Sequence, residues 1–369
     1  MPSFVQKIQA WQQQSGRHNL PWQGTKDPYR VWLSEIMLQQ TQVTTVIDYY
    51  QRFLQRFPTI ADLAMASQEE VMPYWAGLGY YARARNLHHC AVTIWQDYQG
   101  EFPHSPDELI KLKGIGQSTA NSIAAFCFDA KTPIMDGNVK RVFGRYYGIT
   151  GYGSAIDKQL WEQAYKNVIN ETNIGQYNQG LMDLGSLICT RTQAKCSQCP
   201  VQKDCFAAKH NMQNSLPTKK PKKTLPTKET YLLIFKAHHH VLLQQRPQQG
   251  IWGGLLSLPE QESLSAVNSY LSKHSFGQTT EKHSSTQLLA SFEHVFSHYR
   301  LIIHPVMITA QRNTLQDSIF IEDTQWYDIH PENLDKLALP RPIHNLLSGL
   351  SLLDTDSTTS TQMCLPTKS

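Results

Sequence analysis

Four of the chain's seven cysteines lie within seventeen residues, in the stretch "CTRTQAKCSQCPVQKDC". Cys189, Cys196, Cys199 and Cys205 follow the spacing C-x6-C-x2-C-x5-C. Closely spaced thiols set among arginine, lysine and glutamine are typical of metal ligands rather than of buried structural cysteines. Four thiolates suit a zinc ion or an iron–sulfur cluster and leave no open position for catalysis. The spacing therefore predicts a structural metal site without choosing between the two.

Two carboxylates stand in contexts that suit acid–base chemistry. Glu35 lies among apolar residues in "LSEIMLQQTQ", and burial would keep it protonated near neutral pH. Asp136 precedes Gly137 in "PIMDGNVKRV", a break that would expose it. One protonated and one ionised carboxyl can cleave a glycosidic bond, because the first protonates the leaving group and the second stabilises the cationic sugar. Taken singly, either acid could instead be an ordinary surface or capping residue.

A glycine-containing turn joins two predicted helices. "SPDELIKL" has Ser105 three residues before Glu108, a capping box, and "LKGIGQSTANSIAAF" follows it. Gly114 and Gly116 permit a tight turn, after which backbone amides would converge on an anion. This pattern predicts a helix–hairpin–helix at about 105–126 that binds a DNA phosphate. An ordinary corner between two helices is the alternative.

A second loop strengthens the nucleic-acid interpretation. "WAGLGYYARARNLHH" places two tyrosines on a glycine-containing loop beside Arg83 and Arg85. Aromatic side chains can stack on bases while arginines bind phosphates. The alternative, in which the tyrosines pack in the core and the arginines are solvated, would explain less of this stretch.

The elements that must position these residues fall into two groups. Residues 1–212 are predicted to be helical, with one long helical run that starts at the Asp27 cap and Pro28 and continues to residue 57. Prolines and five lysines make 213–228 a linker. Residues 229–350 are predicted to be α+β, with a long strand at 292–308, and 351–369 form a polar tail.

Composition sets the remaining bounds. A chain of 369 residues with 40% hydrophobic content and a formal charge of +4 is expected to fold as two domains with packed cores. It has no membrane-length apolar run and no leader-like N-terminus, which predicts a soluble intracellular protein. Disulfides are rare in such a compartment, which again favours a metal for the cysteines.

Taken together, "LPWQ", "LSEIMLQQTQV", "GLGYYARARNLH", "LKGIGQSTA", "MDGNVKRV", the four cysteines and a later "FSH" resemble the MutY family of adenine DNA glycosylases. All of these except "FSH", which lies at 296–298 in the second domain, occur in that family's order from Leu20 to Cys205. The resemblance implies an all-α helix–hairpin–helix glycosylase domain with a [4Fe–4S] loop at 189–205, followed by a C-terminal α+β Nudix-like domain. We expect a monomeric enzyme of the cytoplasm and nucleoid, and the lack of a transit-like leader favours a prokaryotic source.

The implied substrate is double-stranded DNA in which adenine is mispaired with 8-oxoguanine or guanine, and the implied cofactor is a [4Fe–4S] cluster held by the four cysteines. The enzyme would flip adenine into a pocket. Glu35 would protonate adenine N7, Asp136 would stabilise the sugar cation and Asn138 would fix the geometry. The expected substrate-binding residues are Leu20, Trp22, Ser118 and Gln179, with Arg17 or His18 facing the base. The expected DNA contacts are Gln40, Thr41, Leu78, Tyr80, Gly114, Gly116, Lys140, Phe296, Ser297 and His298.

Ser118 stands where bifunctional relatives such as endonuclease III carry a nucleophilic lysine. Without that amine we expect a monofunctional glycosylase, although Lys140 lies near enough in sequence to trap an abasic sugar. The second domain lacks the glutamate-rich helix of Nudix hydrolases and is expected to read 8-oxoguanine through Phe296, Ser297 and His298. His238, His239 and His240 are expected to lie in an exposed hairpin turn rather than to bind metal.

Three other functions can be weighed against this one. A bifunctional endonuclease III-like lyase would explain residues 20–205, but neither Ser118 nor the second domain. A non-catalytic iron–sulfur DNA-binding protein would leave Glu35 and Asp136 without a role. A Nudix hydrolase of free nucleotides would explain only the last third of the chain, and that part lacks the glutamates that such a hydrolase needs.

Overall fold

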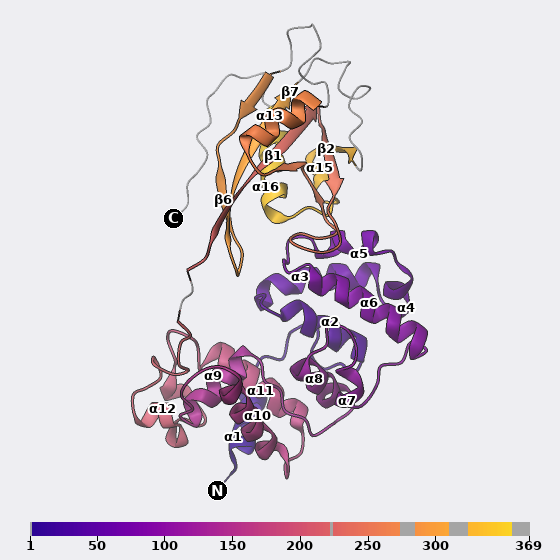
Figure 1. Ribbon diagram of the computed structural model, residues 1–369. Coiled ribbons are helices and arrows are strands. Elements are labelled where there is room, and N and C mark those ends of the chain that lie inside the picture. Colours follow the sequence, from indigo (N-terminus) through magenta and orange to yellow (C-terminus); the bar gives the residue numbers. More distant parts are fainter. Residues whose placement is uncertain (1, 222–223, 274–284, 310–323, 356–369) are drawn as a thin grey trace. The chain divides into compact units, whose positions relative to one another are not determined.

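The structure is a computed structural model that describes residues 2–221, 224–273, 285–309 and 324–355. It divides into two compact units (Figure 1). The first unit comprises Met1–Ser67 and Arg83–Lys222, and the second comprises Gln68–Ala82 and Lys223–Ser369. Residues 68–82, which the sequence placed within the helical domain, therefore group with the C-terminal part of the chain.

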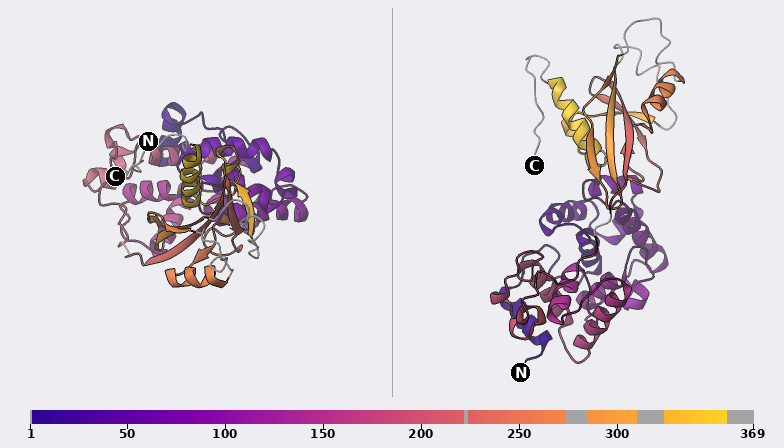
Figure 2. Two further views of the ribbon diagram at one scale, coloured as in Figure 1. Left: turned by 90° about the horizontal axis from the view of Figure 1, so that it is seen from above. Right: turned by 60° about the vertical axis from the view of Figure 1, so that its left-hand side comes forward.

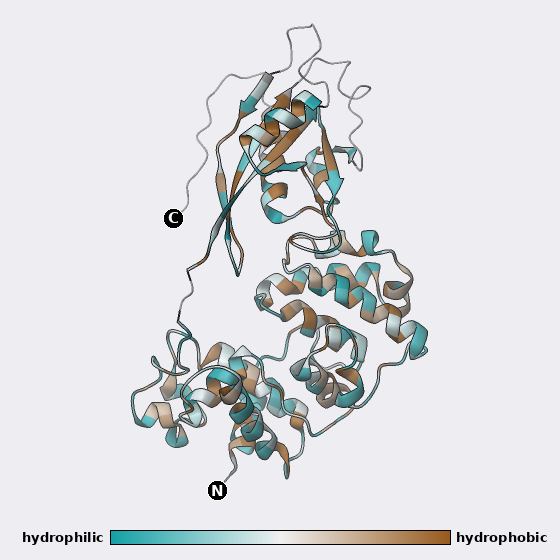
Figure 3. Cartoon of the chain, in the orientation of Figure 1, coloured by the Kyte–Doolittle hydropathy of each residue, from teal (hydrophilic) through white to brown (hydrophobic). Residues whose placement is uncertain are grey.

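The first unit is helical. Its helices are α1 (Phe4–Ser15), α2 (Pro28–Leu38), α3 (Val43–Arg56), α4 (Ile60–Met65), α6 (Ala82–Asp97), α7 (Pro106–Leu109), α8 (Gln117–Cys127), α9 (Gly137–Tyr146), α10 (Ser154–Val168), α11 (Ile174–Leu187) and α12 (Phe206–Lys209), with 3₁₀ turns η1 (Cys196–Gln198) and η2 (Gln202–Asp204). These helices carry both hydrophilic and hydrophobic residues (Figure 3), as amphipathic helices around a shared core do. Among the described residues, no helix is long and apolar enough to span a bilayer.

The long helical run predicted from Asp27 to residue 57 is wrong in one respect, because it consists of two helices. The Asp27 side chain caps α2 by accepting from the Tyr29 amide at 2.9 Å, as predicted. The chain then leaves the helix at Gln39, and Gln40 adopts a left-handed φ of 59° before α3 begins. Apolar periodicity continues across this break and so concealed it.

The turn between α7 and α8 has the predicted hairpin form. Gly114 has a φ of +86°, and a Cβ at this position would come within 2.9 Å of Asn86 Cβ, so glycine is required. The Ser105 hydroxyl accepts from the Glu108 amide at 3.2 Å. Glu108 itself pairs with Lys111 instead of completing the capping box. Helix α8 starts after Gly116 without a side-chain cap.

The core of the first unit lies where α1, α9 and α10 meet α11. Buried side chains there include Ile8, Phe143, Ala164 and Leu181. Helix α11 packs against α1, α8 and α9, and α2 packs against α8 and α3. Helix α11 therefore connects the core to the elements that carry the predicted site residues.

The second unit contains α5 (Gln68–Trp75) and one mixed β-sheet. Its strands are β1 (Thr227–Ala237), β2 (His240–Gln245), β3 (Leu256–Ser257), β4 (Glu260–Gln261), β5 (Ser285–Leu288), β6 (Phe292–Val295), β7 (Arg300–Thr309) and β8 (Thr324–Asp328). The main path runs β3-β2-β1-β7-β5, with β1 and β7 parallel over ten residue pairs from Thr227↔Arg300 to Lys236↔Thr309. Residues 232–235 of β1 are all buried, as expected of a central strand that is covered on both faces.

Helices α13 (Leu264–Lys273) and α16 (Arg341–Thr355) cover opposite faces of this sheet (Figure 2), and α15 (Pro331–Leu334) is a single turn. Val267 of α13 joins Leu233, Phe235 and Val306 in the core. The single strand predicted at 292–308 is wrong, because residues 296–299 form a turn between β6 and β7. His238 and His239 form the turn between β1 and β2, and His240 begins β2.

Candidate active site and DNA-contacting residues

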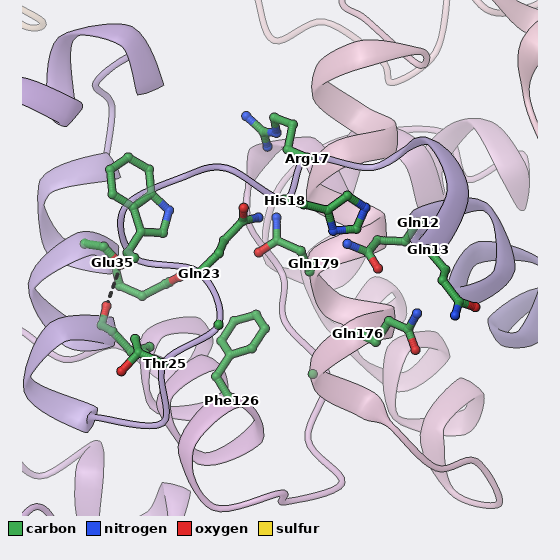
Figure 4. A pocket seen from close by; sticks show the side chains of 15 residues that line it. Gln12, Gln13, Arg17, His18, Gln23, Thr25, Glu35, Phe126, Gln176 and Gln179 are labelled. Atoms are coloured by element: carbon green, nitrogen blue, oxygen red, sulfur yellow. Dashed lines mark hydrogen bonds between the residues drawn. The ribbon is translucent and has the colours of Figure 1, made fainter.

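The first unit contains a cavity of about 440 Å³ between α1 and α11 on one side and α2 and α8 on the other. It is lined by Gln12, Gln13, Arg17, His18, Trp22, Gln23, Gly24, Thr25, Val31, Ser34, Glu35, Phe126, Gly175, Gln176 and Gln179. Figure 4 shows Gln23, Phe126 and Gln179 lying between Glu35 on one side and Gln12 and Gln176 on the other. The cavity is of a size that holds a small planar ligand.

Glu35 projects from α2 onto the wall of this cavity. Its neighbours Leu33, Ile36 and Met37 are buried, which places the carboxyl beside the apolar core. The pKa of Glu35 is raised to about 7, chiefly by burial and to a smaller extent by the negative charge of Asp136. A carboxyl with this pKa is half-protonated near neutral pH and can act as a general acid.

Two other predicted residues, Trp22 and Gln179, also line the cavity. Trp22 is 8% exposed, and its ring meets Tyr50 edge to face at 5.4 Å. Gln179 donates to Asp183 Oδ1 at 3.0 Å. Both side chains are therefore held by neighbours that the sequence did not single out.

Arg17 and His18, of which one was expected to face the base, both line the cavity. Arg17 is fixed: its amide donates to Asp183 Oδ2 at 2.9 Å and its Nε to Oδ1 at 2.7 Å. Asp183 is fully buried. Since the same carboxylate also binds Gln179, one buried acid orients two polar groups of the cavity wall.

Asp136, Asn138 and Ser118 do not line the cavity but form a group linked by hydrogen bonds around Met135 and Asp136. Asp136 caps α9 and accepts from the Val139 amide at 2.7 Å and from Asn138 Nδ2 at 3.0 Å. Ser118 Oγ accepts from the Met135 amide at 3.0 Å. Ser118 therefore supports the backbone that carries Asp136. Leu20 is half-buried and does not line the cavity.

Arg141 connects this group to the cysteine loop, and the sequence analysis missed it. Its guanidinium donates to Asn138 Oδ1 at 2.8 Å, to the Gly185 carbonyl at 2.7 Å and to the Cys189 carbonyl at 2.8 Å. Its position in "GNVKRV", four residues after Gly137, was the available signal.

The four cysteines line one small cavity together with Arg145. None of them forms a disulfide. The pKa of the Cys199 thiol is raised to about 12, chiefly by burial and also by the charges of the other three cysteines, which lie near it. Arg145, 3% exposed, donates to Cys189 Sγ at 3.3 Å and to the Thr190 carbonyl at 2.7 Å.

The donor set supports a group held by all four thiols. Among the described residues, no three His, Cys, Asp or Glu side chains converge closely enough to hold a single ion. Four sulfur ligands around one shared cavity nevertheless fit an iron–sulfur cluster, which is ligated by cysteine thiolates and is larger than an ion.

The predicted DNA contacts of the first unit lie in several places. Gly114 and Gly116 form the turn at the N-terminus of α8, where helix amides without a side-chain cap suit an anion. Gln40 is exposed and Thr41 half-buried in the break between α2 and α3. Lys140 Nζ pairs with Asp157 Oδ1 at 2.6 Å.

The tyrosine loop only partly matches its predicted roles. Tyr80 is 49% exposed with a left-handed φ of 50°, whereas Leu78 is 6% exposed. Arg83 does not present its guanidinium as a free phosphate contact, because Nη1 donates to the Ile36 and Met37 carbonyls at 2.7 and 3.0 Å. It instead satisfies the C-terminal carbonyls of the helix that carries Glu35.

In the second unit, Phe296, Ser297 and His298 lie in the turn between β6 and β7. Phe296 closes the turn by donating its amide to the Tyr299 carbonyl at 2.8 Å. Its ring lies 5.5 Å from that of Trp252 and 4.5 Å from that of His294. Ser297 and His298 are exposed. Helix α13 contains no acidic residue.

Several cavity residues were not anticipated from the sequence. Phe126 lies on α8, and Gln12 and Gln176 lie on α1 and α11. Gln176 and Gln179 are three residues apart and so share a face of α11, which was the one local signal. Asp183, four residues after Gln179, continues that face.

Comparison with known proteins agrees with this fold and site. A model of the HhH-GPD superfamily of base excision DNA repair proteins matches residues 33–166, and a NUDIX domain model matches residues 230–349. The adenine DNA glycosylase of Buchnera aphidicola subsp. Schizaphis graminum is 36% identical over 93% of this chain and 97% of that protein. The human adenine DNA glycosylase is 40% identical over 58% of this chain and 41% of that protein. A solved thermostable thymine-DNA glycosylase is 27% identical, with a TM-score of 0.51, over 56% of this chain and 95% of that chain.

The fold, the cavity carboxyl and these matches define a base excision repair glycosylase of the helix–hairpin–helix class with a C-terminal Nudix-like domain. More narrowly, the chain belongs to the adenine DNA glycosylase family and is a hydrolase of N-glycosyl bonds.

Proposed function

We propose that the enzyme removes adenine that is mispaired with 8-oxoguanine or guanine in double-stranded DNA, by flipping the base into the cavity of the first unit. The observation that carries the proposal is Glu35, whose carboxyl lies on the cavity wall with a pKa of about 7. Flipping costs a few kcal/mol of stacking, which contacts in the pocket must offset. Trp22, Phe126 and the glutamines supply apolar and polar walls for a planar base.

Glu35 protonates N7 of adenine, so that the base leaves as a neutral molecule. The sugar becomes cationic as the glycosidic bond breaks, and the Asp136 carboxylate stabilises that charge. The Val139 amide and the Asn138 side chain donate to Asp136 and keep its oxygens in place. Water then adds to the sugar, the proton that it releases restores the Glu35 carboxyl, and an abasic site remains.

The enzyme is proposed to be monofunctional. Ser118 stands at the position of the lyase lysine, and its hydroxyl accepts a hydrogen bond from the Met135 amide. Lys140 is paired with Asp157, and no adduct is needed for the hydrolysis described above. Strand cleavage therefore requires subsequent alkali.

Cys189, Cys196, Cys199 and Cys205 are proposed to hold a [4Fe–4S] cluster. The cluster would cross-link residues 189–205 and supply no step of the hydrolysis. Arg145 and Arg141 brace the same loop through the Cys189 and Thr190 carbonyls. Arg191 and Lys195 would be kept at the surface for phosphate contacts.

The test uses duplexes that differ only opposite the target adenine: 8-oxoguanine, guanine or thymine. We expect abasic sites opposite 8-oxoguanine and guanine and none opposite thymine, with strand breaks only after alkali. Breaks before alkali would identify a lyase. Binding of all three duplexes without excision would identify a non-catalytic DNA-binding protein.

A further inference from the structure

A buried hydroxyl on the helix that packs against α2 is not used by the mechanism above. Ser122 lies on α8, is fully buried, and among the described residues its Oγ has no hydrogen-bond partner. Helix α8 packs against α2, which carries Glu35. A serine within a helix commonly bonds back to the carbonyl four residues earlier, and Ser122 does not. A buried hydroxyl without a partner is costly, so its presence calls for an acceptor.

We propose that Ser122 is a positioning residue whose hydroxyl donates a hydrogen bond to the ionised Glu35 carboxyl and orients it toward the cavity. The inference rests on the proposed role of Glu35 as the acid. Ser122 also lowers the pKa of Glu35, opposing the larger effect of burial. That direction is the one expected when a hydroxyl donates to the charged form of a carboxyl.

The contact has a defined consequence for pH dependence. Without the donor, the ionised form of Glu35 loses stabilisation and the carboxyl holds its proton to higher pH. The titratable or charged groups around Glu35 and its helix are Asp136, Arg17, His18, Tyr50, Arg83 and Cys127. All of them remain when Ser122 is changed, so a shift in the pH profile reports the hydroxyl.

The experiment measures single-turnover excision of adenine opposite 8-oxoguanine from pH 5 to pH 9 with the full-length protein. In Ser122→Ala the basic limb of the profile should move up by about one pH unit, because a hydrogen bond to a charged group is worth roughly that much. At pH values above the basic limb of the wild type, the excision rate divided by each protein's own plateau rate should then be about tenfold higher in Ser122→Ala than in the wild type.

Ser34→Ala is the matched control. Ser34 is also buried and precedes Glu35 on α2, but its hydroxyl donates to the Val31 carbonyl at 2.8 Å. Whatever this change does to the plateau rate, the basic limb should stay where it is in the wild type. A limb that moves equally in both variants would mean that any buried hydroxyl lost near α2 has this effect, which overturns the inference.

Glu35→Gln, alone and with Ser122→Ala, tests the role of Glu35 as the acid separately from the role of Ser122. If Glu35→Gln retains the basic limb, Glu35 is not the acid and the proposed function fails in that respect. If the limb depends on Glu35 but does not move, or moves down, in Ser122→Ala, the proposed function stands and the role of Ser122 is wrong.

Discussion

The cavity of the first unit and the β6–β7 turn of the second hold their functional side chains in opposite ways. At the cavity, fully buried Asp183 fixes Arg17 and Gln179, and burial alters the pKa of Glu35. At the turn, Ser297 and His298 are exposed, and their side chains lie 3.4 Å apart. Acid catalysis needs a side chain whose proton affinity differs from its value in water, and burial is the largest cause of that difference at Glu35. Recognition of a partner base needs access, which burial would remove.

Glu35→Gln tests whether the cavity carboxyl is the catalytic acid. The amide keeps the size of the side chain and removes the transferable proton, so excision should fall by at least about 10²–10⁴-fold while DNA binding changes little. Single-turnover excision and equilibrium binding measured on the same duplex check both parts. Excision within tenfold of wild type would remove Glu35 from the mechanism.

The same substitution should also stabilise the fold at alkaline pH. The folded-state pKa of Glu35 is raised from 4.5 to about 7, so its favourable contribution is complete below pH 4.5 and is lost as pH rises through 7. Glu35→Gln has no charge to bury and should exceed the wild type by up to about 3 kcal/mol above pH 7. The two proteins should be nearly equal near pH 4.

Urea unfolding at pH 4, 6 and 8 measures that difference. If the difference in the free energy of unfolding is the same at all three pH values, burial does not destabilise the ionised carboxyl. The cavity would then resemble the exposed turn in this respect, and the contrast between the two regions would lose its physical basis.

Parts of this arrangement could be predicted from the sequence and parts could not. The half-buried setting of Glu35 follows from its apolar neighbours, the start of α2 from Asp27 and Pro28, and the cysteine loop from its spacing. These signals are local. The hydrogen bonds of Asp183 and Arg141 link residues that lie far apart in the chain, and no periodicity encodes them.

Two errors have the same origin. The break at Gln40 and the turn at 296–299 are set by backbone angles that a hydrophobic pattern does not specify. Arg83 was expected to bind phosphate because arginines beside aromatic residues often do. Its three hydrogen bonds to α2 and Thr41 depend on how α6 meets α2, which only the folded chain shows.

The hairpin before α8 offers a contrast within the first unit. Gly114→Ala must adopt a φ of +86° and place a Cβ within 2.9 Å of Asn86, so it should destabilise the fold by roughly 1–3 kcal/mol and weaken DNA binding. Gly116→Ala meets no atom within 4 Å and should fold normally. If a phosphate approaches this turn, Gly116→Ala should still weaken DNA binding. Wild-type affinity in Gly116→Ala would place the DNA elsewhere.

The smallest expected effect concerns the exposed turn of the second unit. 8-Oxoguanine differs from guanine by a carbonyl at C8 and a hydrogen at N7, so an acceptor is exchanged for a donor. The Ser297 side chain is exposed, and its hydroxyl can donate or accept a hydrogen bond, which suits it to sense that exchange. One hydrogen bond contributes about 0.5–1.5 kcal/mol, so Ser297→Ala should reduce discrimination several-fold without abolishing excision.

Changing Phe296, Ser297 and His298 together to alanine should enlarge that loss, since it also removes the Phe296 ring that contacts the Trp252 and His294 rings. Deleting residues 229–369 would be a poorer test, because residues 68–82 belong to the same unit and Gln68 bonds Gln248 at 2.6 Å. The triple variant should slow excision of adenine opposite 8-oxoguanine much more than opposite guanine. An equal slowing of both substrates would mean that the turn contributes general DNA affinity or stability, because a side chain that reads the lesion cannot affect a duplex that lacks it.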